Sequence, residues 1–525
     1  MRHFVFENLL LLLYVVNSIK SYKILGVVPA LPYSQFTLGL RLMKALADKG
    51  HQVTFVNSYP QKVPLKNIRD VSTEDIKKVL EGKTFCFFLR KPQKLLHINF
   101  FYFIILRNNF EFSTFLDYTS NVVDFSGLSY WKQLNWVTEL GIKKSTLTFK
   151  NKNVQNLLKS NETFDLVIST NLFSDSFAYF AYKFKCPSII LIPGSTNLFS
   201  NYLVANPSPP SYVTNLLADY GADMNFWQRF SNIIRELVGE IFIHNILIPK
   251  QNQVLKELFP DAPELTSILY DASLILAASH SSFYDPIPLQ QNVKEIGGYH
   301  VQPPKPLPKD LQEFMDNSPE GVVIFSMGSN LKSADFHPEK RRAILNAFSK
   351  IKQKVLWKFE ADLTDKPKNV KISNWLPQSD ILAHRNVLGF ISHGGLLGTT
   401  EAVYHGVPIL GLPIFWDQIK NVDVAVFKGF AVKLDFHNLD EKSFGDALNE
   451  ILNNPTYREA AKERSSIMHD QPIKQIDEAV FWCEYVIRHK GAQHLRSPAL
   501  NLRWYQSYYI DIIIFISVVL ITLLL

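Results

Sequence analysis

Cysteine is scarce in this sequence, with Cys86, Cys186 and Cys483 the three present in 525 residues. An odd number of cysteines with no C-x-x-C pair indicates neither a zinc cage nor a disulfide framework, so we predict no metal site. Runs of basic residues are missing too, although the formal net charge is +7. Without such a run there is no electrostatic stripe for nucleic acid, and we expect no nucleic-acid partner.

Two further patterns are missing. The first strand and helix are not joined by a G-x-G-x-x-G fingerprint, which disfavours an NAD enzyme or a phosphorylase on a double α/β fold. No short-period repeat runs along the chain, which disfavours a solenoid. The sequence instead offers 47% hydrophobic residues in a chain too long for one ordinary core. These features predict two sizeable α/β domains.

The N-terminal part of the chain has the pattern of a βαβ unit. Residues 23–28 form a short apolar run, residues 36–48 have helical spacing, and residues 51–56 form a second strand-like run. Such a unit builds a doubly wound parallel sheet whose ligands bind at the carboxyl ends of the strands. We therefore expect chemistry at the loop formed by residues 32–35.

A proline-rich stretch at residues 301–308 separates this half from a second series of strand and helix signals. The strands of that series are predicted at 322–326, 355–359, 370–373, 388–391 and 430–434. The predicted divisions of the chain are a leader at 1–21, a first domain at 22–300, a linker at 301–320, a second domain at 321–487, a juxtamembrane segment at 488–507 and an anchor at 508–525.

Both ends of the chain carry targeting signals. Residues 9–16 form an apolar run behind a basic start, typical of a secretory signal peptide cleaved between Ser18 and Ser21. Residues 508–525 are nearly all apolar and predict a transmembrane helix, with a buried C-terminal helix as the alternative. These signals place both domains in the secretory lumen. The sequon at Asn161 predicts a glycosylated surface loop there.

The run from residue 390 to residue 418 holds the most specific pattern, FISHGGLLGTTEAVYHGVPILGLPIFWDQ. A strand leads into the Gly394-Gly395 turn, which opens a helix, so backbone N–H groups and the helix dipole converge where a pyrophosphate could lie. His393 can add a hydrogen-bond donor there. Glu401, about two helical turns on, suits a pair of ribose hydroxyls, because a carboxylate accepts hydrogen bonds from both.

Other candidates flank this run. Asp417 and Gln418 can bind sugar hydroxyls, Trp375 offers a flat face for uracil stacking, and Gln378 can add polar contacts. Ser329, in the turn after the strand 322–326, is a further phosphate contact. Taken singly, each has a structural explanation, such as a core tryptophan or a simple turn. Taken together and in this order, they predict a UDP-sugar site.

The same run resembles, without a gap, the signature of the UDP-glycosyltransferase family, in particular its animal, membrane-bound, invertebrate-like members. The resemblance extends to residues 206–215 and 296–300. It implies the α/β GT-B fold, with two Rossmann-like domains facing a cleft and a C-terminal transmembrane helix. It also implies inverting transfer of a hexose from a UDP-sugar, a co-substrate that makes a bound cofactor unnecessary, to small lipophilic acceptors in the endoplasmic reticulum.

The resemblance breaks at the family's catalytic dyad. Family members that act on hydroxyls carry a His in the first βα loop and an acidic residue after a later strand, and here these positions hold Gln35 and Thr170. An amide cannot act as a general base. The first hypothesis is an enzyme whose acceptors need no strong base; the second is a non-catalytic binder of UDP-sugar or lipophiles. Asp175 is the nearest alternative carboxylate. The sequence leaves open glucose or glucuronate as the sugar, and whether the chain forms a homo-oligomer.

Overall fold

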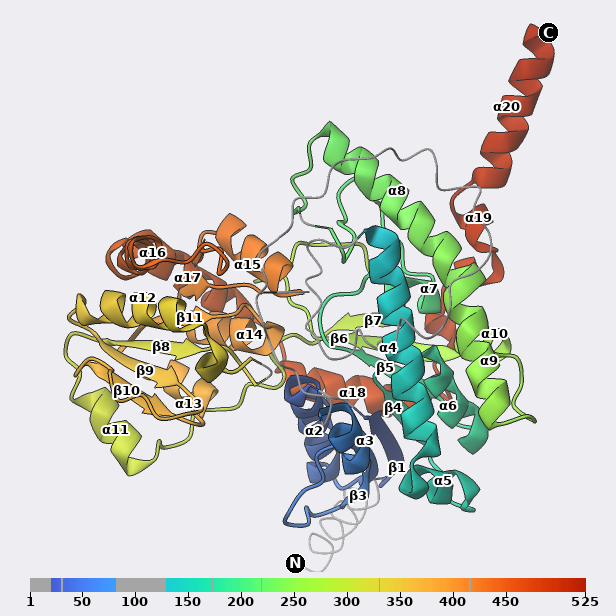
Figure 1. Cartoon of the computed structure of the whole chain (residues 1–525). Coiled ribbons are helices and arrows are strands. Elements are labelled where there is room, and N and C mark those ends of the chain that lie inside the picture. The colour runs from blue at the N-terminus through green and yellow to red at the C-terminus, as the bar shows by residue number, and fades with distance from the viewer. Residues whose placement is uncertain are drawn as a thin grey trace, which may run out of the picture.

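The computed structural model describes residues 20–29, 32–81, 129–171, 173–218, 220–329, 331–414 and 417–525. Residues 1–19 of the predicted leader lie outside the described residues. So does the apolar segment at 95–106, which by its composition predicts an acceptor pocket or a membrane-contacting helix, with an ordinary core helix as the alternative. Two α/β lobes make up the described chain, with the N-terminal sheet in one and the second sheet in the other (Figure 1). This arrangement confirms the prediction of two α/β domains.

The first domain is built on a parallel sheet of seven described strands in the order β3-β2-β1-β4-β5-β6-β7. Side chains of β1 alternate between two apolar cores, with Ile24 and Val28 in one and Leu25 and Val27 in the other. Parallel strands buried on both faces read as continuous apolar runs, as these do. The strands are β1 Lys23–Val28, β2 Gln52–Asn57, β3 Ile68–Ser72, β4 Leu166–Ser169, β5 Ser188–Ile192, β6 Ala272–Ala277 and β7 Val293–Glu295.

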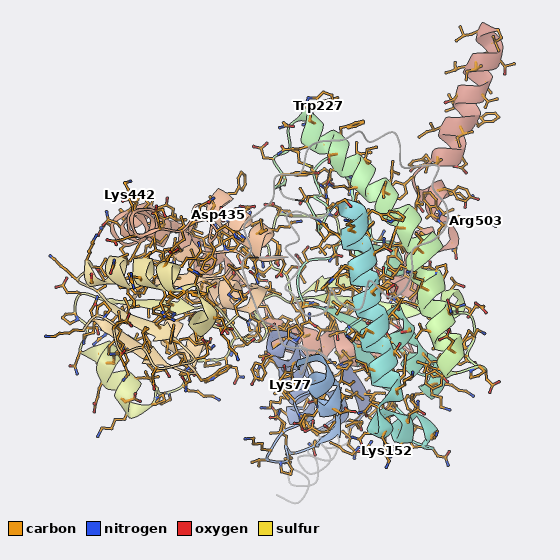
Figure 2. All side chains as sticks on the ribbon, in the orientation of Figure 1. Lys77, Lys152, Trp227, Asp435, Lys442 and Arg503 are labelled. Carbon is orange, nitrogen blue, oxygen red and sulfur yellow. The ribbon has the colours of Figure 1, made fainter. Side chains whose placement is uncertain are left out.

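Helices cover both faces of this sheet. The long helix α4 crosses one face, with α8 and α9 beyond it, and α2 lies on the other side (Figure 1). Trp227 projects from the N-terminal end of α8 into solvent (Figure 2). The helices are α2 Tyr33–Asp48, α3 Glu74–Glu81, α4 Tyr130–Lys150, α5 Lys152–Lys159, α6 Ala178–Phe184, α7 Leu198–Val204, α8 Phe226–Phe242, α9 Ile248–Leu258 and α10 Leu265–Leu269, with the short 3-10 helix η4 Asp175–Phe177 and the π-helix η5 Ile243–Leu247 between α8 and α9.

The second domain repeats this plan with six described parallel strands in the order β10-β9-β8-β11-β12-β13. In both sheets the strand order reverses beside the first strand, between β1 and β4 and between β8 and β11. Such a switch point leaves a crevice at the carboxyl ends of the two strands, where ligands bind. The strands are β8 Val322–Ser326, β9 Lys354–Lys358, β10 Val370–Ser373, β11 Val387–Ser392, β12 Ile409–Gly411 and β13 Ala431–Lys433.

The helices of the second domain flank its sheet on both sides (Figure 1). They are α11 Lys309–Asp316, α12 Pro338–Ser349, α13 Gln378–Leu382, α14 Leu396–His405, α15 Asp417–Phe427, α16 Glu441–Asn453 and α17 Pro455–His469, with the short turn η6 Ser333–Asp335.

Helix α18, Gln475–Arg488, leaves the second domain and packs against α2, β4 and β6 of the first. Cys483 is fully buried in the same core cluster as residues of β1 and α2. At the edge of this contact, Glu484 Oε1 lies 3.1 Å from His51 Nε2, and Lys294 Nζ lies 4.2 Å from the centre of the Trp482 ring. The last helix of the two lobes therefore belongs structurally to the first domain.

The predicted transmembrane helix is wrong. After η7 Gln493–Leu495, η8 Pro498–Asn501 and α19 Trp504–Ser507, the chain ends in α20, Ile510–Leu524. Tyr509 adopts a left-handed conformation with φ of 56°, which starts α20 later than the apolar run begins. Its 15 residues give about 22 Å of helix at 1.5 Å per residue, short of the ~30 Å hydrocarbon core. Across the described ranges, every helix is too short or too polar to cross a bilayer.

Candidate active site

The switch point of the second sheet brings two predicted segments together. Gly328 follows β8 with a φ of 76°, and a Cβ added to it would lie 2.6 Å from Cε1 of His393, which follows β11. A side chain at position 328 is therefore excluded by both the backbone conformation and the histidine ring. Ser329, the next residue, is exposed beside this contact. The predicted phosphate turn and His393 thus lie side by side.

The Gly394-Gly395 turn needs both of its glycines. Gly394 has a φ of 79°, and a Cβ there would lie 2.4 Å from Cγ2 of Val422. A Cβ on Gly395 would lie 2.4 Å from Nε2 of His393. Gly395 is the N-cap of α14, so the N–H groups of the first helical turn point out of this turn. The backbone geometry matches an anion site at a helix N-terminus.

His393 is neutral in this setting. Burial, and next the nearby Lys358 ammonium, lower the pKa of His393 to about 4. Its Nδ1 atom is buried and, within the described parts of the chain, has no hydrogen-bond partner. A buried polar atom without a partner costs free energy unless a ligand or water satisfies it. The imidazole is therefore suited to a hydrogen bond with a bound ligand at the start of α14.

Glu401 and Gln378 meet from α14 and α13. The amide Nε2 of Gln378 donates a hydrogen bond of 2.6 Å to Oε2 of Glu401. Burial raises the pKa of Glu401 to about 7, and the hydrogen bond from Gln378 acts in the opposite direction. The amide fixes one carboxylate oxygen in place. The pair can therefore present an ordered acceptor to a vicinal diol.

Trp375 lies just before α13 and is 58% exposed. Tyr33 of the first domain meets its ring edge-on, at a centroid distance of 5.8 Å and an interplanar angle of 90°. On the second-domain side, Lys358 Nζ lies 6.0 Å from the ring centre. An exposed indole held in this way can stack on a flat base.

Asp417 and Gln418 open α15 but are placed differently. Gln418 is buried, and its Oε1 accepts a hydrogen bond of 3.0 Å from the backbone N–H of Ile414. Asp417 is exposed, and its Oδ2 accepts a hydrogen bond of 3.0 Å from Nδ2 of Asn421. The carboxylate is thus available at the surface, while the glutamine amide oxygen is engaged in its own loop.

Asn421 is a further candidate site residue that the sequence motifs did not indicate. It lies one helical turn after Asp417 on α15 and is buried. Its spacing from Asp417 is the signal that could have identified it, because residues four apart share a helix face.

The two positions of the altered dyad lie at the switch point of the first sheet. Thr170 follows β4 and is buried, and its backbone N–H donates to the carbonyl of Val27 in β1 at 3.1 Å. Gln35 is half-buried and lies in the first turn of α2, which begins three residues earlier than predicted. The N–H groups of Gln35 and Phe36 both donate to the Pro32 carbonyl, and this closes the turn.

Asp175, the alternative carboxylate, is not available as a general base at the switch point of the first sheet. It is buried in η4 and accepts a hydrogen bond from the hydroxyl of Tyr202. Burial raises the pKa of Asp175 to about 7, while the tyrosine and the buried Lys144 act in the opposite direction. The carboxyl therefore fastens η4 to neighbouring helices. Asn161 is exposed between α5 and β4, and its glycosylation stays a prediction.

The comparisons with known proteins agree with this geometry. A family model described as UDP-glucoronosyl and UDP-glucosyl transferase matches residues 79–525. The chain is 35% identical over 509 residues to UDP-glycosyltransferase UGT5 of Dactylopius coccus, covering 96% of this chain and 90% of that protein. It is 38% identical over 318 residues to UDP-glucuronosyltransferase 2B10 of Homo sapiens, covering 60% of each.

Solved structures confirm the GT-B fold. The glycosyltransferase VinC in complex with DTDP matches with a TM-score of 0.54 at 16% identity, covering 89% of this chain and 99% of that one. UDP-glucose: anthocyanidin 3-O-glucosyltransferase in complex with UDP matches with a TM-score of 0.52 at 17% identity, covering 90% of this chain and 100% of that one. With the family model spanning most of its length, the chain belongs to the UDP-glucoronosyl and UDP-glucosyl transferase family.

Proposed function

We propose that this protein transfers a hexose, glucose or glucuronate, from a UDP-sugar to small lipophilic acceptors with inversion at the anomeric carbon. The observation that carries the proposal is the unpartnered, buried Nδ1 of His393 beside the N-terminus of α14. Gly394 and Gly395 supply the turn, and Glu401 supplies an acceptor two helical turns on. The names of the similar proteins point to the same donor class.

In the proposed reaction the acceptor atom attacks the anomeric carbon as the bond to the UDP oxygen breaks. Negative charge then grows on the departing diphosphate. The N–H groups at the start of α14 and the neutral imidazole of His393 oppose that charge, which is electrostatic stabilisation of the transition state. Trp375 holds the uracil and Glu401 the ribose, while Asp417 binds hydroxyls of the hexose.

The acceptor class follows from the altered dyad. Neither Gln35 nor Thr170 can take a proton from an alcohol at neutral pH. Loss of a general base typically costs ~100 to 10,000-fold in rate. The preferred acceptors are therefore those that are nucleophilic without a base: amines, ionised carboxylates and acidic phenols.

The test is UDP release by the purified protein. UDP-glucose and UDP-glucuronate are each offered with a panel of phenols, alcohols, amines and carboxylic acids, and Asp417→Ala serves as the matched variant. We expect release above that variant with at least one amine, carboxylate or acidic phenol. Saturable binding of UDP-sugar without release from any acceptor would favour the second candidate, a non-catalytic binder, which the loss of both dyad members also supports.

We further propose that both domains reside in the lumen of the endoplasmic reticulum. Support comes from the sequon at Asn161, whose side chain is exposed between α5 and β4. A glycan there should be removed by an endoglycosidase, giving a shift in gel mobility that Asn161→Gln abolishes. An unglycosylated protein after expression in insect cells would contradict the proposed location.

A further inference from the structure

One buried amide joins three parts of the molecule. Nδ2 of Asn421 donates to the backbone carbonyl of Gly394 and to Oδ2 of Asp417, at 3.0 Å in each case. Its Oδ1 lies 3.4 Å from the hydroxyl of Tyr284, which donates to it from the loop after β6 of the first domain. Asn421 is 2% exposed. The phosphate turn, the sugar-facing carboxylate and the other domain thus meet at a single side chain.

The chemistry of the amide explains why an asparagine stands here. Its NH₂ group has two hydrogens, and it faces two groups that only accept, a carbonyl and a carboxylate. Its oxygen faces a hydroxyl that can donate. Exchanging the amide's N and O atoms would set oxygen against two acceptors, so the neighbours fix one orientation. Neither leucine nor aspartate, both close to asparagine in size, could satisfy the Gly394 and Asp417 oxygens.

Two other contacts hold α15 to the first domain without touching the donor residues. Lys420 Nζ donates to the backbone carbonyl of Thr214 at 3.2 Å. Lys428 Nζ forms an ion pair of 3.0 Å with Asp285, the neighbour of Tyr284. The domains therefore remain in contact along α15 if the Tyr284 hydroxyl is removed. The Tyr284 hydroxyl is therefore not needed to hold the domains together, and its role is to orient the Asn421 amide.

We propose that Asn421 is a positioning residue that holds the Asp417 carboxylate in a fixed position relative to the Gly394 turn. Tyr284 links this arrangement to the first domain, because its hydroxyl orients the Asn421 amide. The proposal rests on the proposed function, because it assigns Gly394 to the diphosphate and Asp417 to the hexose. Its consequence is that the sugar end of the site is correctly formed when the first domain is docked on α15. The acceptor-binding domain thereby affects how the sugar is held, without touching the nucleotide.

The experiment compares the affinities for UDP and for the UDP-sugar, measured by calorimetry, together with KM and kcat for the UDP-sugar. Tyr284→Phe removes one hydroxyl. We expect its affinity for UDP to stay within about twofold, and KM for the UDP-sugar to rise about fivefold, the loss typical of one hydrogen bond. Asn421→Leu should weaken UDP about tenfold and remove the extra affinity that the hexose gives, because two acceptors lose their donor.

Lys428→Gln is the matched control, since it weakens the same domain contact without facing Asp417 or Gly394. It should leave both affinities unchanged. If it raises KM for the UDP-sugar as much as Tyr284→Phe does, domain packing rather than the amide is responsible and the proposal is wrong. Unchanged sugar affinity in both Asn421→Leu and Tyr284→Phe also overturns it. Failure of the unaltered protein to bind UDP would instead refute the donor site itself.

Discussion

The two sheets have the same strand order around their switch points, yet the polar groups at these points differ sharply. At the second sheet, His393 lies against the glycine turn at the start of α14, Glu401 lies further along that helix, and Asp417 is linked to the turn through Asn421. At the first sheet, the corresponding edge offers the amide of Gln35 and the hydroxyl of Thr170. The second sheet offers the groups that we propose bind the donor. At the first sheet, neither side chain at the positions of the predicted dyad can act as a general base.

The groups proposed to bind the donor are thus present, whereas a base that would activate a hydroxyl acceptor is missing from positions 35 and 170. Asp175, the alternative carboxylate considered from the sequence, is buried and accepts a hydrogen bond from the Tyr202 hydroxyl.

The largest change in activity should come from restoring a general base at the switch point of the first sheet. Gln35→His combined with Thr170→Asp should raise the turnover of simple phenols by ~100-fold or more, because a general base then accepts the phenol proton. Product formation with UDP-glucose measures the gain. Each single variant is the control, since neither completes the dyad. Unchanged phenol turnover in the double variant would contradict the role assigned to these positions.

In the second domain, the largest loss of UDP affinity should come from adding a methyl group to the glycine turn. Gly394→Ala forces a Cβ into a left-handed residue and to within 2.4 Å of Val422. We expect UDP affinity to fall ~100-fold as the turn rebuilds. Gly389→Ala in β11 is the control, because a Cβ there would have its nearest neighbour at 3.8 Å. Equal affinity in the two variants would show that the turn does not bind the diphosphate.

Removing the indole ring of Trp375 should have a smaller effect on UDP affinity. Trp375→Ala should weaken UDP binding about tenfold, since base stacking on an aromatic side chain is worth ~1–3 kcal/mol. Calorimetry with UDP and with inorganic pyrophosphate separates the contributions, because pyrophosphate has no base. A loss of pyrophosphate affinity equal to that of UDP would show that the tryptophan supports the fold rather than uracil.

The pH dependence of the donor should follow Glu401. Its pKa of about 7 means that the carboxyl becomes protonated in the empty site as pH falls through 7. The protonated form accepts fewer hydrogen bonds from the ribose, so affinity for UDP-glucose should fall about tenfold from pH 8 to pH 6. Glu401→Gln should bind weakly and almost independently of pH. A persistent slope in that variant would assign the titration to another group.

The smallest effect on rate is expected at Asp175. Asp175→Asn should leave transfer unchanged for every acceptor, because the carboxyl lies in the core and not at the reacting edge. The free energy of unfolding should nevertheless fall by ~1 kcal/mol, since the Tyr202 hydroxyl then donates to an amide oxygen instead of a carboxyl oxygen. Denaturant unfolding and the UDP-release assay together check this. A large loss of transfer with normal stability would make Asp175 the missing base.

Much of this architecture could be predicted from the sequence, because apolar runs with turn signals mark buried parallel strands. The first strand was expected at 23–28 and β1 spans Lys23–Val28; a strand expected at 388–391 is β11, Val387–Ser392. The glycine turn and the position of Glu401 on the following helix could also be predicted, since their spacing follows from the geometry of one strand and one helix.

What could not be predicted depends either on contacts between distant segments or on single residues whose backbone conformation sets where a helix begins. Tyr284 lies 137 positions from Asn421, and no local pattern pairs them. Helix α2 starts earlier than its apolar spacing suggests, because Pro32 rather than a hydrophobic residue sets its first turn. The anchor prediction failed for a similar reason: hydropathy counts apolar residues, whereas Tyr509 decides where α20 begins.

Helix α18 makes the first domain discontinuous. A chain emerging from the ribosome would complete the seven described strands of the first sheet and the strands of the second before residues 475–488, which pack against α2, became available. Until then the part of α2 that packs against α18 would lack this cover. The domain made first would thus finish folding last, in the presence of its partner. During that interval, the exposed face of α2 is where a chaperone would be needed.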